Sequence, residues 1–351
     1  MGSKLLMKGN EAIGETAIRA GCRHYFGYPI TPQSEVPEYL ARRMPEVDGV
    51  FLQAESELAA ISMVYGAAGA GARVMTSSSS PGISLQQEGI SYLAAAELPT
   101  VIINMVRGGP GIGSIAPSQA DYYQSTRGGG HGDYRLIVLA PSSVQELVDL
   151  TWEAFVITDR YRNPVLVLGD GMLGQMMEAI SLPEHPAPEL PRPWATDGCK
   201  GRKHNEIFTL FLKAEELEEN NQRLARKISL MEQQEQRWDE YFTEDAELVV
   251  VAYGIAARVG RRAVKLARDR GIKVGLFRPI SLWPYPSEAL SRAADKASSL
   301  LVVELNLGQM IDDVKLALGN TRPVHFYGKT NIVPSPEEIL TVIENMAGAG
   351  R

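Results

Sequence analysis

Two carboxylates, Glu55 and Glu57, stand where the apolar run at 49–54 gives way to the small-residue stretch "VYGAAGAGA" at 64–72. A carboxylate at the start of a helix can stabilise the helix N-terminus, a surface role worth less than about 1 kcal/mol. It can also carry a proton in catalysis. Spacing alone favours the first role. The small residues beyond Glu57 indicate a helix whose backbone packs closely against a ligand or another subunit.

Thr31 and Arg107 lie in stretches that follow apolar, strand-like runs. Thr31 belongs to "YPITP" (28–32), which two prolines stiffen. Arg107 opens the Gly-rich stretch "RGGPGIG" (107–113). Open α/β sheets bind ligands at the carboxyl ends of their strands, and a planar guanidinium binds a carboxylate with two hydrogen bonds. Taken alone, Thr31 is equally well a turn hydroxyl and Arg107 a surface ion-pair partner.

Other motifs do not indicate a metal, phosphate or cysteine site. The "GDG" at 169–171 lacks a following Asn that could complete a magnesium site, and we interpret it as a turn. His131 lies among glycines without the companions of a metal ligand. The Gly-rich loops do not match a phosphate-binding pattern. Cys22 and Cys199 are too few for a disulfide framework or a four-thiolate cluster.

The elements that must position these residues alternate between strands and helices. Short apolar runs at 49–54, 72–77, 98–106, 134–140 and 163–169 alternate with helical stretches at about 57–71, 82–96 and 142–159. This alternation predicts an α/β domain with a doubly wound parallel sheet for residues 1–180.

The rest of the chain divides into a connecting segment and a second α/β unit. A Pro-rich strap at 181–193 precedes a charged helical pattern at 205–242, and together they form the expected linker, 181–245. We expect an amphipathic helix packed on its own protein, rather than a free coiled coil, and we expect subunit contacts within 181–243. A second βαβ pattern predicts another α/β domain at 246–351.

Composition and charge restrict the partners. A chain of 351 residues with a net charge of -7 and no basic tract is not expected to bind nucleic acid or an anionic membrane. The N-terminal residues lack the apolar core of a signal peptide, and no apolar stretch is long enough to span a bilayer. With only two cysteines, we expect a cytoplasmic protein.

Five motifs occur together and in order: "GYPITPQSE" (27–35), "QAESELAA" (53–60), "VYGAAGAGARVMTSSSSPGISLQQEG" (64–89), "VRGGPG" (106–111) and "GGGHGD" (128–133). This combination resembles the α subunits of 2-oxoacid:ferredoxin oxidoreductases, the pyruvate and 2-oxoglutarate synthase superfamily. The similarity is greatest to the type that acts on branched-chain 2-oxoacids such as 3-methyl-2-oxobutanoate. "FRPISLWPYP" (277–286) and "VVELNLGQM" (302–310) extend it into a transketolase-C-like second domain.

The resemblance implies that residues 1–180 form the pyrimidine-binding domain for thiamine diphosphate. In this family one glutamate bonds N1′ of the pyrimidine ring and helps to remove the cofactor's C2 proton. Counting back from Val64 places that glutamate at Glu57, and leaves Glu55 as a supporting or capping group. The loop Tyr28, Pro29, Ile30 and Thr31 is expected to contact the cofactor, and Thr31 and Arg107 to hold the substrate carboxylate.

The resemblance also implies a shared active site. A β subunit is expected to supply the Mg-diphosphate half of the thiamine site. A γ subunit and a ferredoxin-like iron–sulfur subunit are expected as further partners. The implied reaction is oxidative decarboxylation of a 2-oxoacid, with coenzyme A as co-substrate and external ferredoxin as electron acceptor.

Three alternatives remain open. The substrate could be 2-oxoglutarate. A related thiamine enzyme, such as an indolepyruvate oxidoreductase or a transketolase-like synthase, should carry cysteine clusters or a complete "GDG…N" site, and the sequence has neither. A non-catalytic scaffolding subunit would keep the fold without the chemistry, which Glu57, Thr31 and Arg107 argue against.

Overall fold

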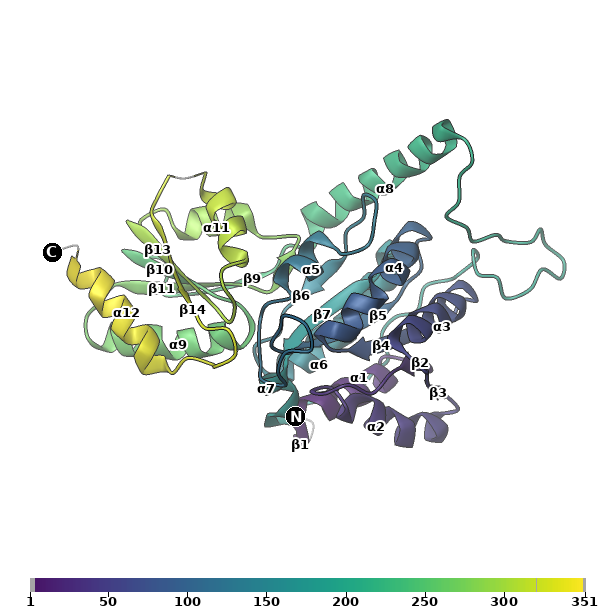
Figure 1. Cartoon of the computed structure of the whole chain (residues 1–351), viewed down its shortest axis with the longest axis horizontal. Coiled ribbons are helices and arrows are strands. Elements are labelled where there is room, and N and C mark those ends of the chain that lie inside the picture. The colour runs from purple at the N-terminus through teal and green to yellow at the C-terminus, as the bar shows by residue number, and fades with distance from the viewer. Residues whose placement is uncertain (1–3, 320, 350–351) are drawn as a thin grey trace.

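The structure, a computed structural model, describes residues 4–319 and 321–349 (Figure 1). Its largest sheet has seven strands in the order β12-β6-β7-β5-β4-β2-β3. Neighbouring strands run parallel, except that β12 is antiparallel to β6. The strands are β2 (His24–Gly27), β3 (Val50–Gln53), β4 (Val74–Ser78), β5 (Val101–Val106), β6 (Ile137–Leu139), β7 (Val165–Asp170) and β12 (Ser281–Trp283).

Helices cover both faces of this sheet. As a result, its central strands β4, β5 and β7 are buried along their whole length. Residues such as Ile13, Leu40 and Phe155 pack α1, α2 and α6 on one face. Ile61 and Ile83 pack α3 and α4 on the other. The helices are α1 (Gly9–Arg19), α2 (Glu35–Arg43), α3 (Glu57–Gly69), α4 (Ser80–Ala95), α5 (Tyr122–Arg127), α6 (Val144–Tyr161) and α7 (Gly171–Gln175), with a 3₁₀ turn at Met44–Val47. The predicted doubly wound parallel sheet is confirmed.

The other strands among the described residues form two smaller sheets. β1 (Leu5–Lys8) pairs antiparallel with β8 (Met177–Ile180). A five-stranded sheet in the order β14-β13-β10-β11-β9 forms the second α/β unit, on the left in Figure 1. Its strands are β9 (Trp238–Tyr241), β10 (Leu248–Val251), β11 (Val274–Pro279), β13 (Ser299–Glu304) and β14 (Val324–Gly328); its helices are α9 (Gly254–Asp269), α10 (Ser287–Ala293), α11 (Met310–Leu318) and α12 (Pro336–Ala349).

The two large sheets exchange strands across the expected domain boundaries. β9 lies inside the expected linker, yet it pairs antiparallel with β11 of the second sheet. β12 comes from the expected second domain, yet it closes the edge of the first sheet beside β6. The domain boundaries at 180 and 245 therefore stay a prediction from the sequence. Each of the two large sheets includes one strand from beyond its expected boundary.

Buried polar contacts hold the two units together. The Gln119 side chain donates to Tyr253 O at 2.8 Å and accepts from Leu305 N at 2.9 Å. Arg278 of β11 makes a two-bond ion pair with Glu146 of α6, at 2.7 and 2.9 Å. Each contact satisfies groups that would otherwise be buried without partners, so the contact surface is specific.

The predicted helix at 205–242 is shorter than expected. α8 spans Ala214–Gln234, and residues 205–213 before it have no regular secondary structure. The prediction was wrong at this end because "IFTLF" (207–211) is rich in aromatic and β-branched residues, which favour extended backbone. The helix itself packs on its own protein through the buried Leu224 and Met231, as expected.

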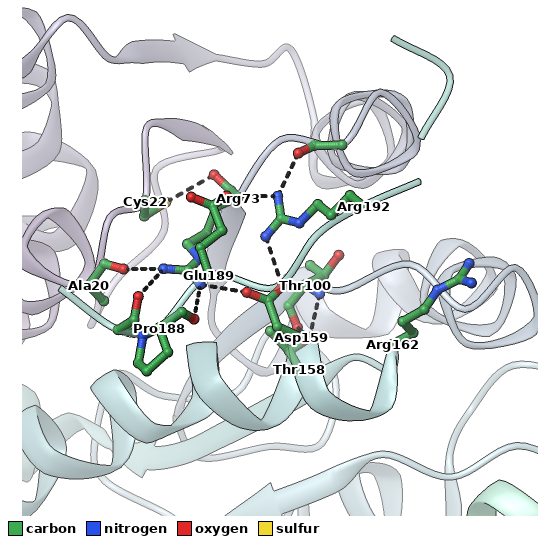
Figure 2. Close-up of polar contacts among 12 residues, drawn as sticks. Ala20, Cys22, Arg73, Thr100, Thr158, Asp159, Arg162, Pro188, Glu189 and Arg192 are labelled. Carbon is green, nitrogen blue, oxygen red and sulfur yellow. Dashed lines mark hydrogen bonds and ion pairs between the residues drawn. The ribbon is translucent and has the colours of Figure 1, made fainter. Parts of the chain in front are cut away.

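A buried ion cluster binds the Pro-rich strap to the first unit (Figure 2). Arg73 and Arg192 bind the two oxygens of Asp159 at 2.5 and 2.8 Å. Arg73 also donates to the strap carbonyls of Ala187 and Pro188, at 2.9 and 2.7 Å. A proline-rich backbone cannot pair in a sheet, so the polar groups of the strap need other partners. Here they are bonded to side chains of the first unit.

Within the described residues, none of the helices is both long enough and apolar enough to cross a membrane.

Candidate functional site

The predicted site segments meet at one edge of the seven-stranded sheet. β2, β4 and β5 run parallel and end there. β2 is followed by the "YPITP" loop and β5 by Arg107, and the serine run Ser77–Ser80 extends from the last two residues of β4 to the first residue of α4. The carboxyl ends of parallel strands are where α/β sheets bind ligands.

Glu57 is the first residue of α3 and is only 5% exposed. Its Oε1 accepts a hydrogen bond from Ser78 Oγ at 3.3 Å. A Cβ atom at Gly82 would collide with both Ser78 Oγ and the Glu57 carboxyl. The glycine thus lets the first turn of α4 lie directly against this carboxyl group.

Glu55 lies outside this contact. Its side chain is exposed, and the cap of α3 is Ser56, whose hydroxyl accepts from Ala59 N at 3.2 Å. The interpretation of Glu55 as a capping group was therefore wrong. Ser56, between the two glutamates, has the extended backbone and the short hydroxyl side chain that a helix cap needs.

Arg107 and Thr31 are brought together. Arg107 Nη1 donates to the backbone oxygen of Thr31 at 3.1 Å, and Nη2 donates to the backbone oxygen of Ile112 at 2.9 Å. Arg107 N also donates to Ser80 Oγ at 3.1 Å. The Thr31 side chain is exposed, whereas Arg107 Nε is buried without a hydrogen-bond partner among the described residues. The guanidinium therefore joins the Pro-rich loop to the Gly-rich loop.

A chain of buried hydroxyls supports the Pro-rich loop. Tyr25 OH and Ser77 Oγ are 2.7 Å apart, and Ser77 Oγ donates to Gln33 Oε1 at 2.6 Å. Gln33 Nε2 in turn donates to the backbone oxygen of Tyr28 at 3.3 Å. Tyr28 and Pro29 are exposed and Ile30 is half-buried. The loop thus presents its side chains outward from a fixed backbone.

The serine run was not among the predicted site residues. Ser77 supports the Pro-rich loop, Ser78 bonds Glu57, and Ser80 bonds the backbone of Arg107. The signal was visible in the sequence, because four serines at the end of an apolar, strand-like run place hydroxyls at the strand's carboxyl end.

A buried acid behind the serine run was also missed. Asn104 of β5 donates to Asp121 Oδ2 at 2.9 Å. Burial raises the pKa of Asp121 above its ordinary value, and hydrogen bonds from Ser80 and Asn104 oppose this shift. Asn104 Oδ1 and Ser79 Oγ are buried without hydrogen-bond partners among the described residues.

The "GDG" motif, interpreted as a turn, is instead the junction between β7 and α7. Asp170 of "GDG" is the N-cap of α7, accepting from Met172 N and Leu173 N at 2.9 and 3.1 Å. Burial raises its pKa to about 6, although these N–H groups act against the shift. His131 is exposed, and nearby Gly129 N donates to Gln87 of α4 at 2.9 Å. The described residues contain no cluster of three or more metal-ligating side chains.

The second unit reaches this edge through Asn331. A Cβ atom at Gly108 would overlap Asn331 Oδ1, so the loop after β14 lies directly on the residue that follows Arg107. The Gly-rich loop is therefore held from both units.

Two protein families match the chain. The family described as "Pyruvate flavodoxin/ferredoxin oxidoreductase, thiamine diP-bdg" covers residues 15–244. The family described as "Pyruvate:ferredoxin oxidoreductase core domain II" covers residues 246–339.

Individual relatives agree with these families. The chain is 53% identical to the ketoisovalerate oxidoreductase subunit VorB of Methanothermobacter marburgensis, over 90% of each chain. It is 38% identical to the 2-oxoglutarate synthase subunit KorA of Methanothermobacter thermautotrophicus, over 99% of this chain and all of the relative.

Solved structures support the fold. A 2-oxoglutarate:ferredoxin oxidoreductase from Magnetococcus marinus superposes with a TM-score of 0.87 and 26% identity, covering 98% of this chain but only 65% of that longer one. A split-gene transketolase superposes with a TM-score of 0.61 at 14% identity, which agrees with the predicted transketolase-like architecture. The chain belongs to the 2-oxoacid:ferredoxin oxidoreductase family, as a subunit with the family's thiamine-diphosphate-binding domain.

Proposed function

We propose that this chain is the subunit that binds the pyrimidine half of thiamine diphosphate in an enzyme that oxidatively decarboxylates 3-methyl-2-oxobutanoate. The products are an acyl-coenzyme A, carbon dioxide and reduced ferredoxin. The observation that carries the proposal is the nearly buried Glu57 at the start of α3, pressed against α4 and linked through the serine run to Arg107.

The residues at this edge fit the pyrimidine half of the cofactor. Oε1 of Glu57 is held by Ser78, and Oε2 has no hydrogen-bond partner among the described residues. One oxygen is therefore available for a ring nitrogen. The unpaired buried oxygens of Ser79 and Asn104 lie on the adjoining strand ends. Buried polar atoms without partners are costly, and a polar ligand nearby would lower that cost.

Thiamine diphosphate, when bound, supplies a carbon nucleophile for the 2-oxoacid carbonyl and stabilises the charge left by decarboxylation. Glu57 would hold a proton at N1′ of the pyrimidine ring, and Ser78 would keep the carboxyl group in place. Because Glu57 is only 5% exposed, little water would compete for the same hydrogen bond. The "YPIT" loop, from Tyr28 to Thr31, would contact the ring from the adjoining strand.

Arg107 and Thr31 would bind the substrate carboxylate. Nη2 of Arg107 now bonds the carbonyl of Ile112, which is 85% exposed. That contact can be exchanged for a carboxylate oxygen while Nη1 stays on the Thr31 carbonyl. The exposed hydroxyl of Thr31 would accept or donate the second polar contact.

Partner subunits would complete the enzyme. A β subunit would supply Mg and the diphosphate contacts, and iron–sulfur clusters would lie on β and on a ferredoxin-like subunit. A γ subunit completes the expected assembly, and a cytoplasmic location belongs to the same proposal. Asp170, which would open a Mg-diphosphate motif, is instead occupied as the cap of α7.

The choice of substrate rests on two observations. Identity is 53% to the ketoisovalerate relative and 38% to the 2-oxoglutarate relative. The residues beside the Arg107 contacts, Ile30 and Ile112, are apolar, which suits a branched aliphatic side chain better than a second carboxylate. The runner-up is 2-oxoglutarate, which is bound in the Magnetococcus marinus structure.

Steady-state kinetics on the assembled complex test this proposal. We expect kcat/KM for 3-methyl-2-oxobutanoate to exceed that for 2-oxoglutarate by about tenfold or more, the usual discrimination of one apolar contact against a polar group. A preference for 2-oxoglutarate would identify the chain as a 2-oxoglutarate synthase subunit. Absence of activity with any 2-oxoacid, with all partners present, would favour a scaffolding role.

A further inference from the structure

Asp121 is an acid beside the candidate site to which the proposed reaction gives no role. It occupies the N-cap position of α5, where an aspartate usually bonds the first N–H groups of its own helix, but its side chain makes no such bond. The carboxylate instead accepts hydrogen bonds from Asn104 of β5, at 2.9 Å, and from the hydroxyl of Ser80, the first residue of α4. Asp121 is thus bound to the carboxyl edge of the sheet rather than to its own helix.

The second unit fixes the backbone that carries Asp121. The side chain of Gln309, at the start of α11, donates to the backbone oxygen of Ala120 and accepts from Tyr123 N, both at 2.8 Å. These two contacts hold the chain on each side of Asp121. The carboxylate therefore has a defined place relative to its two hydrogen-bond donors.

Ser80 connects Asp121 to Arg107. Its Oγ accepts from Arg107 N at 3.1 Å and lies 3.3 Å from Arg107 O. A hydroxyl has one proton to donate, and a carboxylate is a stronger acceptor than a backbone carbonyl. Asp121 therefore draws this proton to itself and leaves the Ser80 oxygen to accept from the Arg107 N–H group, a bond that the polarised hydroxyl strengthens.

We propose that Asp121 is a positioning residue for Arg107, acting through Ser80 on the backbone from which the guanidinium reaches the substrate carboxylate. The inference rests on the role proposed for Arg107 above. The guanidinium itself bonds the carbonyls of Thr31 and Ile112, and both residues lie in loops. The contact with Ser80 joins Arg107 to the start of a helix instead, and small misplacements of a substrate-binding group cost much of its effect.

Steady-state kinetics and C2-proton exchange on the assembled complex test this role. Asp121→Leu should raise KM for the preferred 2-oxoacid by about tenfold and leave kcat nearly unchanged, as expected when a substrate-binding contact is weakened. Exchange of the cofactor's C2 proton should stay within about threefold of the wild type, because Asp121 bonds Ser80 and Asn104 and not the proton-carrying Glu57.

Asp121→Asn should restore a KM close to that of the wild type. The asparagine oxygen can still accept from Ser80. Its amide nitrogen can donate to Oδ1 of Asn104, which has no hydrogen-bond partner among the described residues, once that amide turns over. A KM as high in Asp121→Asn as in Asp121→Leu would contradict an action through Ser80.

A double variant separates positioning from general stability. Added to Arg107→Lys, Asp121→Leu should lower kcat/KM by less than about twofold more, because both changes act on one contact. The matched control is Asp313→Leu, which removes a buried carboxylate from the neighbouring Tyr122, at 2.5 Å, and from Arg127, at 2.9 Å. It should lower the thermal midpoint without changing KM. Losses that multiply in the double variant would overturn the proposal.

Hydrogen exchange of the purified chain tests the link to Arg107 without any reaction. The amide of Arg107 should exchange about fivefold faster in Asp121→Leu and in Ser80→Ala, since each weakens its hydrogen bond, and at the wild-type rate in Asp313→Leu. Should Asp121→Leu not fold, as judged by circular dichroism, Ser80→Ala carries the same expectations for exchange and KM. An unchanged rate at Arg107 would overturn the proposal.

The kinetic outcomes also separate this inference from the function on which it rests. If Arg107→Lys lowers kcat/KM while Asp121→Leu leaves KM unchanged, the positioning role is wrong and the proposed function stands. If neither variant changes KM, the role proposed for Arg107 is wrong, and the positioning role falls with it.

Discussion

Glu57 and Arg107 differ in how many of their hydrogen-bonding atoms already have partners. Glu57 uses one oxygen for Ser78, and its other oxygen has no hydrogen-bond partner in the part of the chain that the structure describes, whereas both terminal nitrogens of Arg107 donate to loop carbonyls. A ligand could therefore bond Glu57 directly, but it would have to replace a contact at Arg107. The two residues call for different experiments.

Glu57→Gln should leave thiamine diphosphate bound to the assembled complex but slow exchange of the cofactor's C2 proton by about 10²-fold or more. Glutamine preserves the shape of the side chain but cannot carry the proton. Exchange into deuterated buffer, followed by NMR, measures this step without knowledge of the substrate. The control is Glu55→Gln, because Glu55 is exposed two residues away. Slow exchange in Glu55→Gln and normal exchange in Glu57→Gln would reverse the assignment.

Arg107→Lys should lower kcat/KM for the 2-oxoacid by about tenfold or more, in line with the 1.5–3 kcal/mol of a charged hydrogen bond. Lysine keeps the charge but loses the planar fork. The matched control is Arg23→Lys, because Arg23 Nη1 also donates to two backbone carbonyls, both at 2.9 Å, near the start of β2. Equal losses in both variants would assign Arg107 to loop structure alone.

Sequence reasoning at this scale reached Glu57, Thr31 and Arg107 only through the family resemblance. Spacing alone favoured a helix terminus for Glu57, and left a turn hydroxyl for Thr31 and a surface ion pair for Arg107 as probable as a functional role. The contact between Asn104 and Asp121 could not be predicted, because one sequence cannot show that residues 17 positions apart are hydrogen-bonded to each other. The structure brings Thr31 and Arg107 together, but their roles stay predictions.

At the scale of the elements, the strap depends on one carboxylate. Asp159 forms ion pairs with two arginines, Arg73 and Arg192, whose side chains are 5% and 9% exposed. Asp159→Asn would leave Arg73 without its carboxylate partner and Arg192 with only the exposed Glu189 at 3.6 Å, at a cost of about 3–5 kcal/mol. We expect a lower thermal midpoint and faster hydrogen exchange in 187–193.

The control for that variant is Asp269→Asn. Asp269 pairs with Lys265 at 3.2 Å on the surface, with the carboxylate side chain 57% exposed, and such pairs contribute less than about 1 kcal/mol. If the two variants melt alike, the strap is held by packing rather than by the ion cluster.

The cap of α7 should make stability depend on pH. The pKa of Asp170 is raised from 3.8 to about 6 in the folded chain, so the folded state binds the proton more tightly than the unfolded state. Its contribution to stability is present below about pH 4 and is lost as the pH rises through about 6. Asp170→Asn keeps a cap but removes the buried charge, and should be more stable by about 1–3 kcal/mol at pH 7.

Thermal melts of Asp170→Asn and the wild type at pH 4 and pH 7 check this. The difference should vanish at the lower pH, where the wild-type carboxyl is already protonated. A variant less stable than the wild type at pH 7 would mean that the two N–H groups of α7 require a charged acceptor.

Element prediction succeeded where the local pattern was strong. α3, α4 and α6 begin within two residues of the expected positions, because apolar spacing and caps agree there. β12 was not predicted, since three residues beside a Pro-rich turn carry no periodic signal and pair only through tertiary contact. The helix predicted at 205–242 was too long at both ends, since the aromatic and β-branched residues at 207–211 precede α8 and residues 238–241 form β9.

At the scale of the whole molecule, the proposed active site lies between chains. The purified chain alone should bind thiamine diphosphate weakly and convert no 2-oxoacid, because the proposed site holds only the pyrimidine half. Calorimetry with and without the β subunit measures the difference in affinity. Appreciable decarboxylation by the chain alone would contradict a divided site.

The antiparallel pairing of β12 with β6 also sets an order of events on the ribosome. Leu139 of β6 cannot meet Ser281 until about 140 further residues have been made. At about 5–20 residues per second, that is a wait of roughly 7–30 s. During synthesis β6 is an open strand edge, which can pair with neighbouring nascent chains, although its length of three residues makes it a poor template. Chains released before residue 281 therefore keep this edge unpaired and should aggregate more readily than chains that contain β12.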